Sequence, residues 1–161
     1  MTCDDGDDRF LIYDSFDADK EHERILVFSS FGMRQRASAA VEIFADGTYR
    51  TASNTIATLY TIHTVIDRIS FPIFFTLMPN EAEKTFVRAF EVVRPFMCSF
   101  IETCTAHVDC QLAAVNAIRS VFGCSIRICL STRTKPCGDR FHDLGWPDIT
   151  TTCTFQNSTF G

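Results

Sequence analysis

Three β-rich segments follow one another with only short polar links between them, and this spacing constrains the fold more than any other feature of the chain. The segments are TYRTAS (48–53), TLYTIHTVID (58–67) and FPIFFTLM (71–78). The second alternates partly between apolar and polar residues, as a half-buried antiparallel strand does. The third is almost continuously apolar, which is typical of a strand covered on both faces. Short links between such segments predict a β-meander.

Two helices are predicted after the meander. The segment 80–93 carries apolar residues on one stripe at helical spacing, with Asn80 as its expected N-cap and Pro95 as its stop. The segment 111–122 has a second apolar stripe, and Gly123 is its expected C-cap.

Further strands are predicted at 10–15, 25–31, 96–108 and 125–130. A short helix at 33–44 is expected to lead into the strand that carries Asp46. A meander followed by alternating helices and strands predicts an α/β fold, a mixed sheet with helices flanking it.

The length and composition favour one domain. The 161 residues, 46% of them apolar, are enough to bury a sizeable core. The acidic residues 1–9 are expected to be disordered, and the domain is expected to occupy 10–130. Residues 131–161 lose all periodicity and are predicted to form a mostly irregular tail.

The charge and the cysteines restrict the function. The formal net charge of −5 gives no long-range attraction to nucleic acid. No signal peptide or membrane-spanning run is present, so the chain is predicted to be intracellular and not secreted. The eight cysteines are then expected to be free and mostly buried. Cys129, Cys137 and His142 are an alternative zinc set, although their spacing matches no standard site.

Two aspartates carry the chemistry that the sequence suggests. Asp46 precedes Gly47, so it either forms a turn or ends a strand that delivers a carboxylate to a metal. Asp109 lies where a predicted strand gives way to a helix, so it is either an N-cap or a second ligand. If their strands are neighbours, the two carboxylates meet at one edge of the sheet. Mg²⁺ or Mn²⁺ takes such oxygen ligands, and two ions about 3.5–4 Å apart can clamp a phosphodiester.

Two histidines lie near these aspartates in the sequence or in the predicted sheet. His63 is on a strand, where a structural role is the commoner one. His107 comes two residues before Asp109 and could approach the same site.

The motifs, taken together, resemble the transposase domain of Mutator-like elements (MULE). RFLIYDS, RILVFSS, FADGTYRTAS, LYTIHTVID, FPIFFTLMPNEAEKTFVRAFEVV and VDCQLAAVNAIRSVFG occur in the family's order over about 9–130. The resemblance implies a ribonuclease-H-like fold and DNA cutting and joining by two metal ions held by a DDE triad. It implies that Asp46 and Asp109 are the first two catalytic acids and metal ligands, with Mg²⁺ or Mn²⁺ as cofactor.

The chain departs from the family pattern in three places. Gln111 stands two residues after the second aspartate, at a position where the family usually has an acid. Thr132 replaces the histidine of a Cys-x-x-His element that begins at Cys129. No glutamate follows Glu102, so the third acid is missing, and Asp139, Asp143 and Asp148 have no recognisable context. A frameshift near Leu130 or an exon boundary would explain the change, and the fold is expected to be incomplete at its C-terminus.

The resemblance and its departures predict a fragment or relic of a transposase catalytic domain. Weak metal binding and no strand transfer are expected of this chain alone, because catalysis by positioning does not tolerate a loose site. The alternative is a domesticated, non-catalytic module that binds DNA or protein, and a third hypothesis is a nuclease completed by another chain. The family implies transposon-end DNA as partner, a possible homo-oligomer and a nuclear location. No membrane or small-molecule partner is expected.

Overall fold

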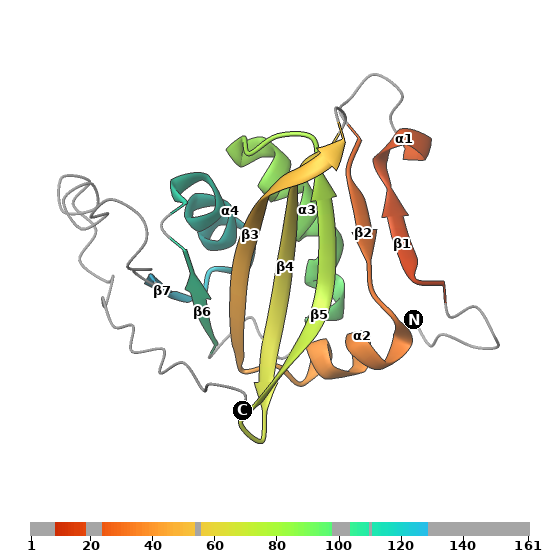
Figure 1. The fold of residues 1–161 in the computed structure, drawn as a ribbon. Coiled ribbons are helices and arrows are strands. Elements are labelled where there is room, and N and C mark those ends of the chain that lie inside the picture. The colour runs from red at the N-terminus through yellow and green to blue at the C-terminus, as the bar shows by residue number, and fades with distance from the viewer. Residues whose placement is uncertain (1–8, 19–23, 54–55, 98–103, 110, 129–161) are drawn as a thin grey trace, which may run out of the picture.

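The computed structural model describes residues 9–18, 24–53, 56–97, 104–109 and 111–128. These residues form a seven-stranded mixed sheet with helices packed against it (Figure 1). The strand order across the sheet is β1-β2-β5-β4-β3-β6-β7. The elements in chain order are β1 (Leu11–Asp14), α1 (Ser15–Ala18), β2 (Leu26–Phe28), α2 (Phe31–Ser38), β3 (Glu42–Ser53), β4 (Ile56–Ile66), β5 (Ile69–Met78), α3 (Glu83–Val93), the 3₁₀ helix η1 (Arg94–Phe96), β6 (Thr105–Val108), α4 (Leu112–Phe122) and β7 (Ser125–Ile128).

The predicted meander and the α/β class are confirmed. β3, β4 and β5 pair antiparallel in sequence order, and β6 and β7 extend the sheet from β3 in parallel. The two short N-terminal strands complete the other side, where β2 pairs with β5 and β1 with β2. Each parallel connection passes through a helix, because parallel neighbours need a long crossover.

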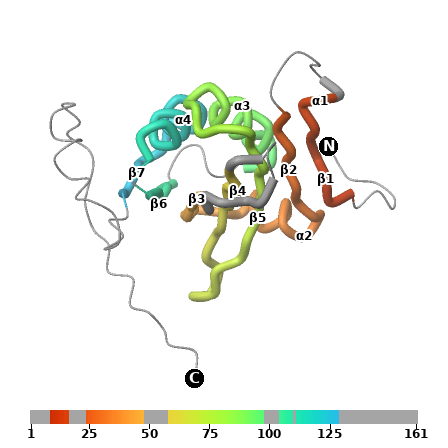
Figure 2. Tube along the Cα trace, turned by 45° about the horizontal axis from the view of Figure 1, so that its top comes forward, coloured from red at the N-terminus to blue at the C-terminus, as the bar shows by residue number. Residues whose placement is uncertain are grey.

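Helices α3 and α4 lie side by side on one face of the sheet (Figure 2). Their apolar stripes enter the core, with Phe86 and Phe90 of α3 and Phe122 of α4 almost fully buried. Tyr60 of β4 reaches this layer, with its ring centroid 5.0 Å from that of Phe86. The Phe90 and Phe122 ring centroids are 5.9 Å apart, so aromatic contacts join the sheet to both helices.

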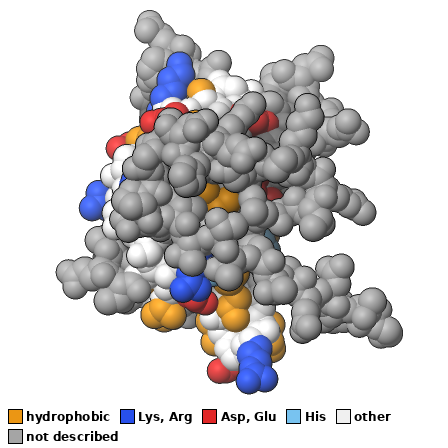
Figure 3. Space-filling model, turned by 90° about the vertical axis from the view of Figure 1, so that its left-hand side faces the viewer, with side chains coloured by type: hydrophobic (Ala, Val, Ile, Leu, Met, Phe, Trp, Pro, Cys, Tyr) orange, Lys and Arg blue, Asp and Glu red, His pale blue; other side chains and the backbone are white. Residues whose placement is uncertain are grey.

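The β4–β5 hairpin ends in a two-residue turn. Ile66 pairs with Ile69, and both intervening residues have positive φ, 52° at Asp67 and 68° at Arg68. Such turns match the right-handed twist of the strands they join. Figure 3 shows the lower end of the molecule, where Figure 1 places this hairpin tip, with apolar side chains beside charged ones.

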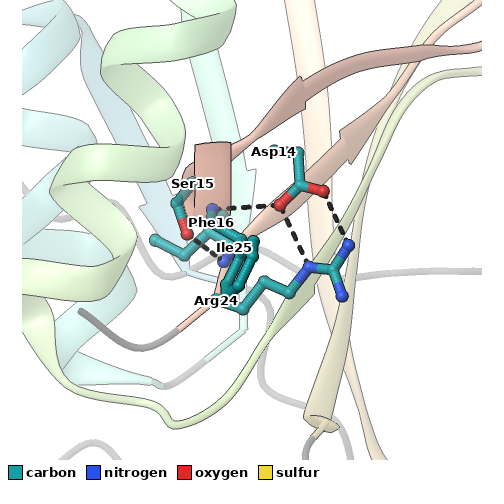
Figure 4. Close-up of polar contacts among 5 residues, drawn as sticks. All are labelled: Asp14, Ser15, Phe16, Arg24 and Ile25. Atoms are coloured by element: carbon teal, nitrogen blue, oxygen red, sulfur yellow. Dashed lines mark hydrogen bonds and ion pairs between the residues drawn. The ribbon is translucent and has the colours of Figure 1, made fainter. Parts of the chain in front are cut away.

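A salt bridge links the end of the edge strand β1 to a residue just before β2 (Figure 4). Arg24 donates to both carboxylate oxygens of Asp14, from Nε at 3.0 Å and from Nη2 at 2.7 Å. This guanidinium is the main cause that holds the pKa of Asp14 below its usual range. The neighbouring Ser15 accepts a hydrogen bond at its Oγ from the Ile25 backbone N–H, at 2.7 Å. These contacts join β1 to the start of β2.

Several predicted segments have the wrong boundaries: the strands expected at 10–15 and 25–31 are shorter, and their last residues, Ser15 and Phe31, begin α1 and α2. The helix expected at 33–44 ends at Ser38, and Glu42 to Phe44 belong to β3, because these residues pair with β4 or β6 on the two sides. Pairing with neighbouring strands outweighs the helix propensity of an alanine-rich segment. Of the strand expected at 96–108, the described residues form a strand only in β6, and Phe96 belongs to η1. Residues 98–103 lie outside the described part.

Helix α4 has the C-cap that the sequence predicts, whereas α3 does not have its predicted N-cap. Gly123 caps α4 in the left-handed conformation, as predicted. Ala82, not Asn80, is the N-cap of α3. The Asn80 Oδ1 accepts hydrogen bonds from the Ala82 N–H and the Thr85 hydroxyl, so this residue closes the turn before the helix.

Several further expectations concern residues outside the described part of the chain. These are the disorder predicted for residues 1–9, of which only Arg9 is described, the tail predicted at 131–161, the zinc set of Cys129, Cys137 and His142, and the late acids Asp139, Asp143 and Asp148. Cys104, which is described, is buried, as expected. Among the described helices, none combines the length and the apolar character needed to cross a membrane.

Candidate functional site

Asp46 and Asp109 come from adjacent parallel strands. The β3–β6 register pairs Ala45 with Val108, Asp46 is the next residue of β3, and Asp109 is the first residue after β6. Ala45 and Val108 are both buried. Since side chains alternate along a strand, the Asp46 side chain lies on the face of β3 opposite to Ala45, and Asp109 follows the end of a strand about 4.8 Å away. The prediction that the two strands are neighbours is confirmed.

Asp46 lies inside a strand, so the turn interpretation of Asp-Gly is wrong. β3 continues through this dipeptide to Ser53, with Asp46 opposite Thr61 and Gly47 opposite Tyr60. The Thr61 hydroxyl donates to the Asp46 backbone carbonyl at 3.4 Å. The backbone is thus held by β4, while the side chain is exposed.

Asp109 is not the N-cap of α4, which is Gln111. The Asp109 Oδ1 instead accepts a hydrogen bond from the Gln111 backbone N–H, at 3.4 Å. The carboxylate is half-buried at the end of β6. One of its oxygens is therefore oriented by the turn that leads into the helix.

His63 lies on the same face as Asp46, opposite Phe44 in the β3–β4 register. Burial lowers the pKa of His63 below its usual range, and the negative charge of Asp46 acts in the opposite direction. The Ser70 hydroxyl is 3.4 Å from His63 Nδ1. His63 is therefore partly enclosed and within electrostatic range of the first aspartate.

His107 packs flat on Phe44, with ring centroids 4.4 Å apart and an angle of 10° between the planes. Its Nε2 is buried and has no hydrogen bond among the described residues. The Glu42 Oε1 lies 3.6 Å from this nitrogen, which is an ion-pair distance only if His107 is protonated. His107 thus lies beside Glu42, on the same sheet face as Asp46.

The family model of the MULE transposase domain matches residues 42–134, more than half of the chain. The chain belongs to the MULE transposase family. No curated protein and no solved structure matches it. The matched range contains both aspartates and every element from β3 to β7, while β1, β2 and α2 precede it.

The MULE domain also has a carboxylate near Asp109 that local sequence patterns do not single out. Glu81, in the link between β5 and α3, accepts a hydrogen bond from the Gln111 side chain. Glu42, on the same strand face as Asp46, was likewise missed. Glu42 alternates with Phe44 and Asp46 along the strand, and this two-residue period could have indicated that it shares their face. No local pattern could have predicted the contact of Glu81 with Gln111, which is 30 positions away in the sequence.

The donor set of this MULE domain suits a hard divalent cation. Asp46 and Asp109 offer carboxylate oxygens at one level of two adjacent strands, and Mg²⁺ sites commonly use one or two protein carboxylates plus substrate phosphate. No group of three or more histidine, cysteine, aspartate or glutamate side chains that could hold a metal occurs in the described residues. The described residues therefore offer two aspartates at neighbouring positions and no third ligand of this kind beside them.

Proposed function

We propose that this chain is the part of a DDE-type DNA transposase catalytic domain that supplies two of the three acids. The observation that carries the proposal is the β3–β6 register, which brings Asp46 and Asp109 to one level of the sheet. Membership of the MULE family supports DNA as the substrate. DNA as substrate would place the protein in the nucleus of a cell that has one.

The proposal includes a ribonuclease-H-like fold. Its support is the order β5-β4-β3-β6-β7, in which three antiparallel strands are followed by two parallel ones. In this arrangement the first strand of the meander lies at the centre of the five. The first acid is then on a strand that is paired on both sides, which fixes its backbone.

Asp46 and Asp109 would hold Mg²⁺ or Mn²⁺ against a DNA phosphate. The bound ions supply a Lewis acid and an activated oxygen nucleophile for phosphodiester displacement. The chain itself orients the Asp109 carboxylate through Gln111 and shields one side of the site with the Phe44–His107 stack. Because the net charge is −5, a cation between the carboxylates and the phosphate would offset their repulsion.

We propose that this chain alone does not carry out strand transfer. The described residues offer two acids at the site and no third, so metal positions would be loosely defined. The same observation favours a second candidate, a non-catalytic module that binds DNA or protein. A second copy or another chain that brings a carboxylate to the site is the third.

Metal binding tests the proposal directly. Mn²⁺ affinity is measured by electron paramagnetic resonance for the full chain, Asp46→Asn, Asp109→Asn and the control Glu91→Gln, an exposed carboxylate on α3. Either aspartate variant is expected to weaken binding at least about tenfold, and the control is expected to leave it unchanged. Equal affinity in all four proteins would contradict the metal site.

A plasmid assay separates the candidate functions. Mn²⁺-dependent nicking that is lost in Asp46→Asn would show that the chain is active, against our expectation. Activity that rises with protein concentration more steeply than first order would support completion by a second chain. DNA binding that persists in EDTA without nicking would support the non-catalytic module.

A further inference from the structure

Glu81 connects three elements near the end of β6. Its Oε2 accepts a hydrogen bond from Gln111 Nε2 at 3.0 Å, and its Oε1 accepts one from the Thr58 hydroxyl at 3.2 Å. Thr58 is fully buried in β4, and Gln111 is the N-cap residue of α4. One exposed carboxylate thus ties the turn after β6 to a central strand of the meander.

Gln111 transmits this restraint to Asp109. Its side chain is held by Glu81, and its backbone N–H donates to the Asp109 Oδ1 at 3.4 Å. The β3–β6 pairing ends at Val108, so Asp109 lies one residue beyond the last paired position. A shift of Gln111 would therefore move the Asp109 carboxylate relative to Asp46, whose backbone is paired with β4.

We propose that Glu81 is a positioning residue for Asp109, which it holds at its distance from Asp46 through Gln111. The proposal rests on the metal site of the proposed function. Glu81 acts in it as a positioning residue, because its two oxygens accept hydrogen bonds from Gln111 and Thr58. Its effect on the metal is indirect and depends on the hydrogen bond to Gln111.

Glu83 provides a matched control. Its Oε2 accepts a hydrogen bond from Asn116 Nδ2 at 2.7 Å, so it also joins α3 to α4 through an exposed carboxylate–amide contact. Asn116 lies more than one helical turn beyond Gln111. Loss of Glu83 removes the same kind of bond and the same charge without touching the turn that holds Asp109.

The experiment compares the full chain with Glu81→Ala, Glu83→Ala, Gln111→Glu and the double variant Glu81→Gln/Gln111→Glu. Mn²⁺ affinity is measured by electron paramagnetic resonance. Hydrogen exchange of the backbone amide at position 111 is measured by NMR without metal. The double variant keeps the net charge and reverses the direction of the hydrogen bond, since the amide introduced at position 81 then donates to the carboxylate introduced at position 111.

We expect Glu81→Ala to weaken Mn²⁺ binding about tenfold, and both Glu81→Ala and Gln111→Glu to speed amide exchange at position 111 several-fold. Glu83→Ala should change neither readout, and the double variant should restore the slow amide exchange. Unchanged amide exchange at position 111 in Glu81→Ala would overturn the proposal. Equal effects of Glu81→Ala and Glu83→Ala would overturn it as well.

The two readouts separate this proposal from the proposed function. If the unmodified chain binds no Mn²⁺, the metal site fails, and amide exchange alone decides whether Glu81 holds the turn. Faster exchange in Glu81→Ala but not in Glu83→Ala would then support the restraint, and equal exchange would refute it. If Glu81→Ala does not fold, Gln111→Glu and the double variant give the same decision.

Discussion

Asp46 and Asp109 stand at one level of the sheet, each one residue beyond the paired residues Ala45 and Val108 of two parallel strands. Between them the chain runs through β4, β5 and α3 before it returns to this point. This pairing brings the backbones of the two aspartates together from segments that lie far apart in the sequence. The candidate site therefore depends on strand register, not on proximity in the sequence.

The negative charge of Asp46 should have a measurable effect on the pKa of His63. Asp46 raises the pKa of this histidine against the larger lowering effect of burial, so Asp46→Asn should lower the pKa further in the metal-free protein. Titration of the His63 Cε1–H resonance by NMR measures the change. Glu83→Gln, on α3, should leave the titration unmoved, and an unchanged pKa in Asp46→Asn would place the two side chains out of electrostatic range.

The same shift gives a pH dependence of stability. The pKa of folded His63 lies below the unfolded value of 6.5, so its contribution is fully present above pH 6.5 and is lost as the pH falls through the folded pKa. A His63→Gln variant should lose stability less steeply on acidification than the parent chain. Urea midpoints measured in steps from about pH 7.5 downward through pH 6.5 give the difference. If the stability of both proteins decreased equally with falling pH, His63 would be excluded as a cause of the pH dependence.

The aromatic contacts between sheet and helices should carry much of the core stability. Phe90 is almost fully buried and its ring meets those of Tyr60, Phe86 and Phe122. Phe90→Ala should lower the free energy of unfolding by about 3–5 kcal/mol, because it leaves a cavity. Urea denaturation measures it. Ile69→Ala, at an exposed position of the hairpin, is the control and should change stability by less than about 1 kcal/mol.

The β4–β5 turn is not built from the residues that its conformation favours. Arg68 has φ 68°, which glycine adopts without steric cost. Arg68→Gly should stabilise the chain by about 1 kcal/mol, measured by urea denaturation. Gly123 is the reciprocal case, because its φ is 64° and a methyl group at its Cα would meet no other atom within 4 Å. Gly123→Ala should therefore destabilise by a similar amount through backbone strain alone. A loss of stability in Arg68→Gly would mean that the arginine side chain contributes more than its backbone costs.

The Asp14–Arg24 bridge should make stability depend on acid pH. The pKa of Asp14 is lowered in the folded chain, mainly by the Arg24 hydrogen bonds, so its contribution is present above the unfolded value of 3.8 and is lost as the pH falls through the folded pKa. Arg24→Gln should lower the urea midpoint at about pH 7, and this difference should shrink as the pH falls below 3.8. Lys84→Gln, an exposed change elsewhere, should show no such pH dependence.

Local sequence patterns determined several elements of this protein. The apolar stripe of 111–122 and Gly123 after it predicted α4 and its C-cap, because helix periodicity and a left-handed glycine act within a few residues. The closely spaced β-rich segments predicted the meander for the same reason. The neighbouring strands of Asp46 and Asp109 followed from the order of these elements.

Only the tertiary structure decided how Asp46-Gly47 and Gln111 are used. Asp-Gly is a strong turn signal, yet pairing with β4 keeps this dipeptide in a strand, since sheet hydrogen bonds outweigh a local preference. Asp109 had the properties of an N-cap, but the helix begins after Gln111, whose side chain is held by Glu81. The sequence by itself determined which elements form, because their causes are local. The fold decided which carboxylates meet, because such contacts join residues far apart in the chain.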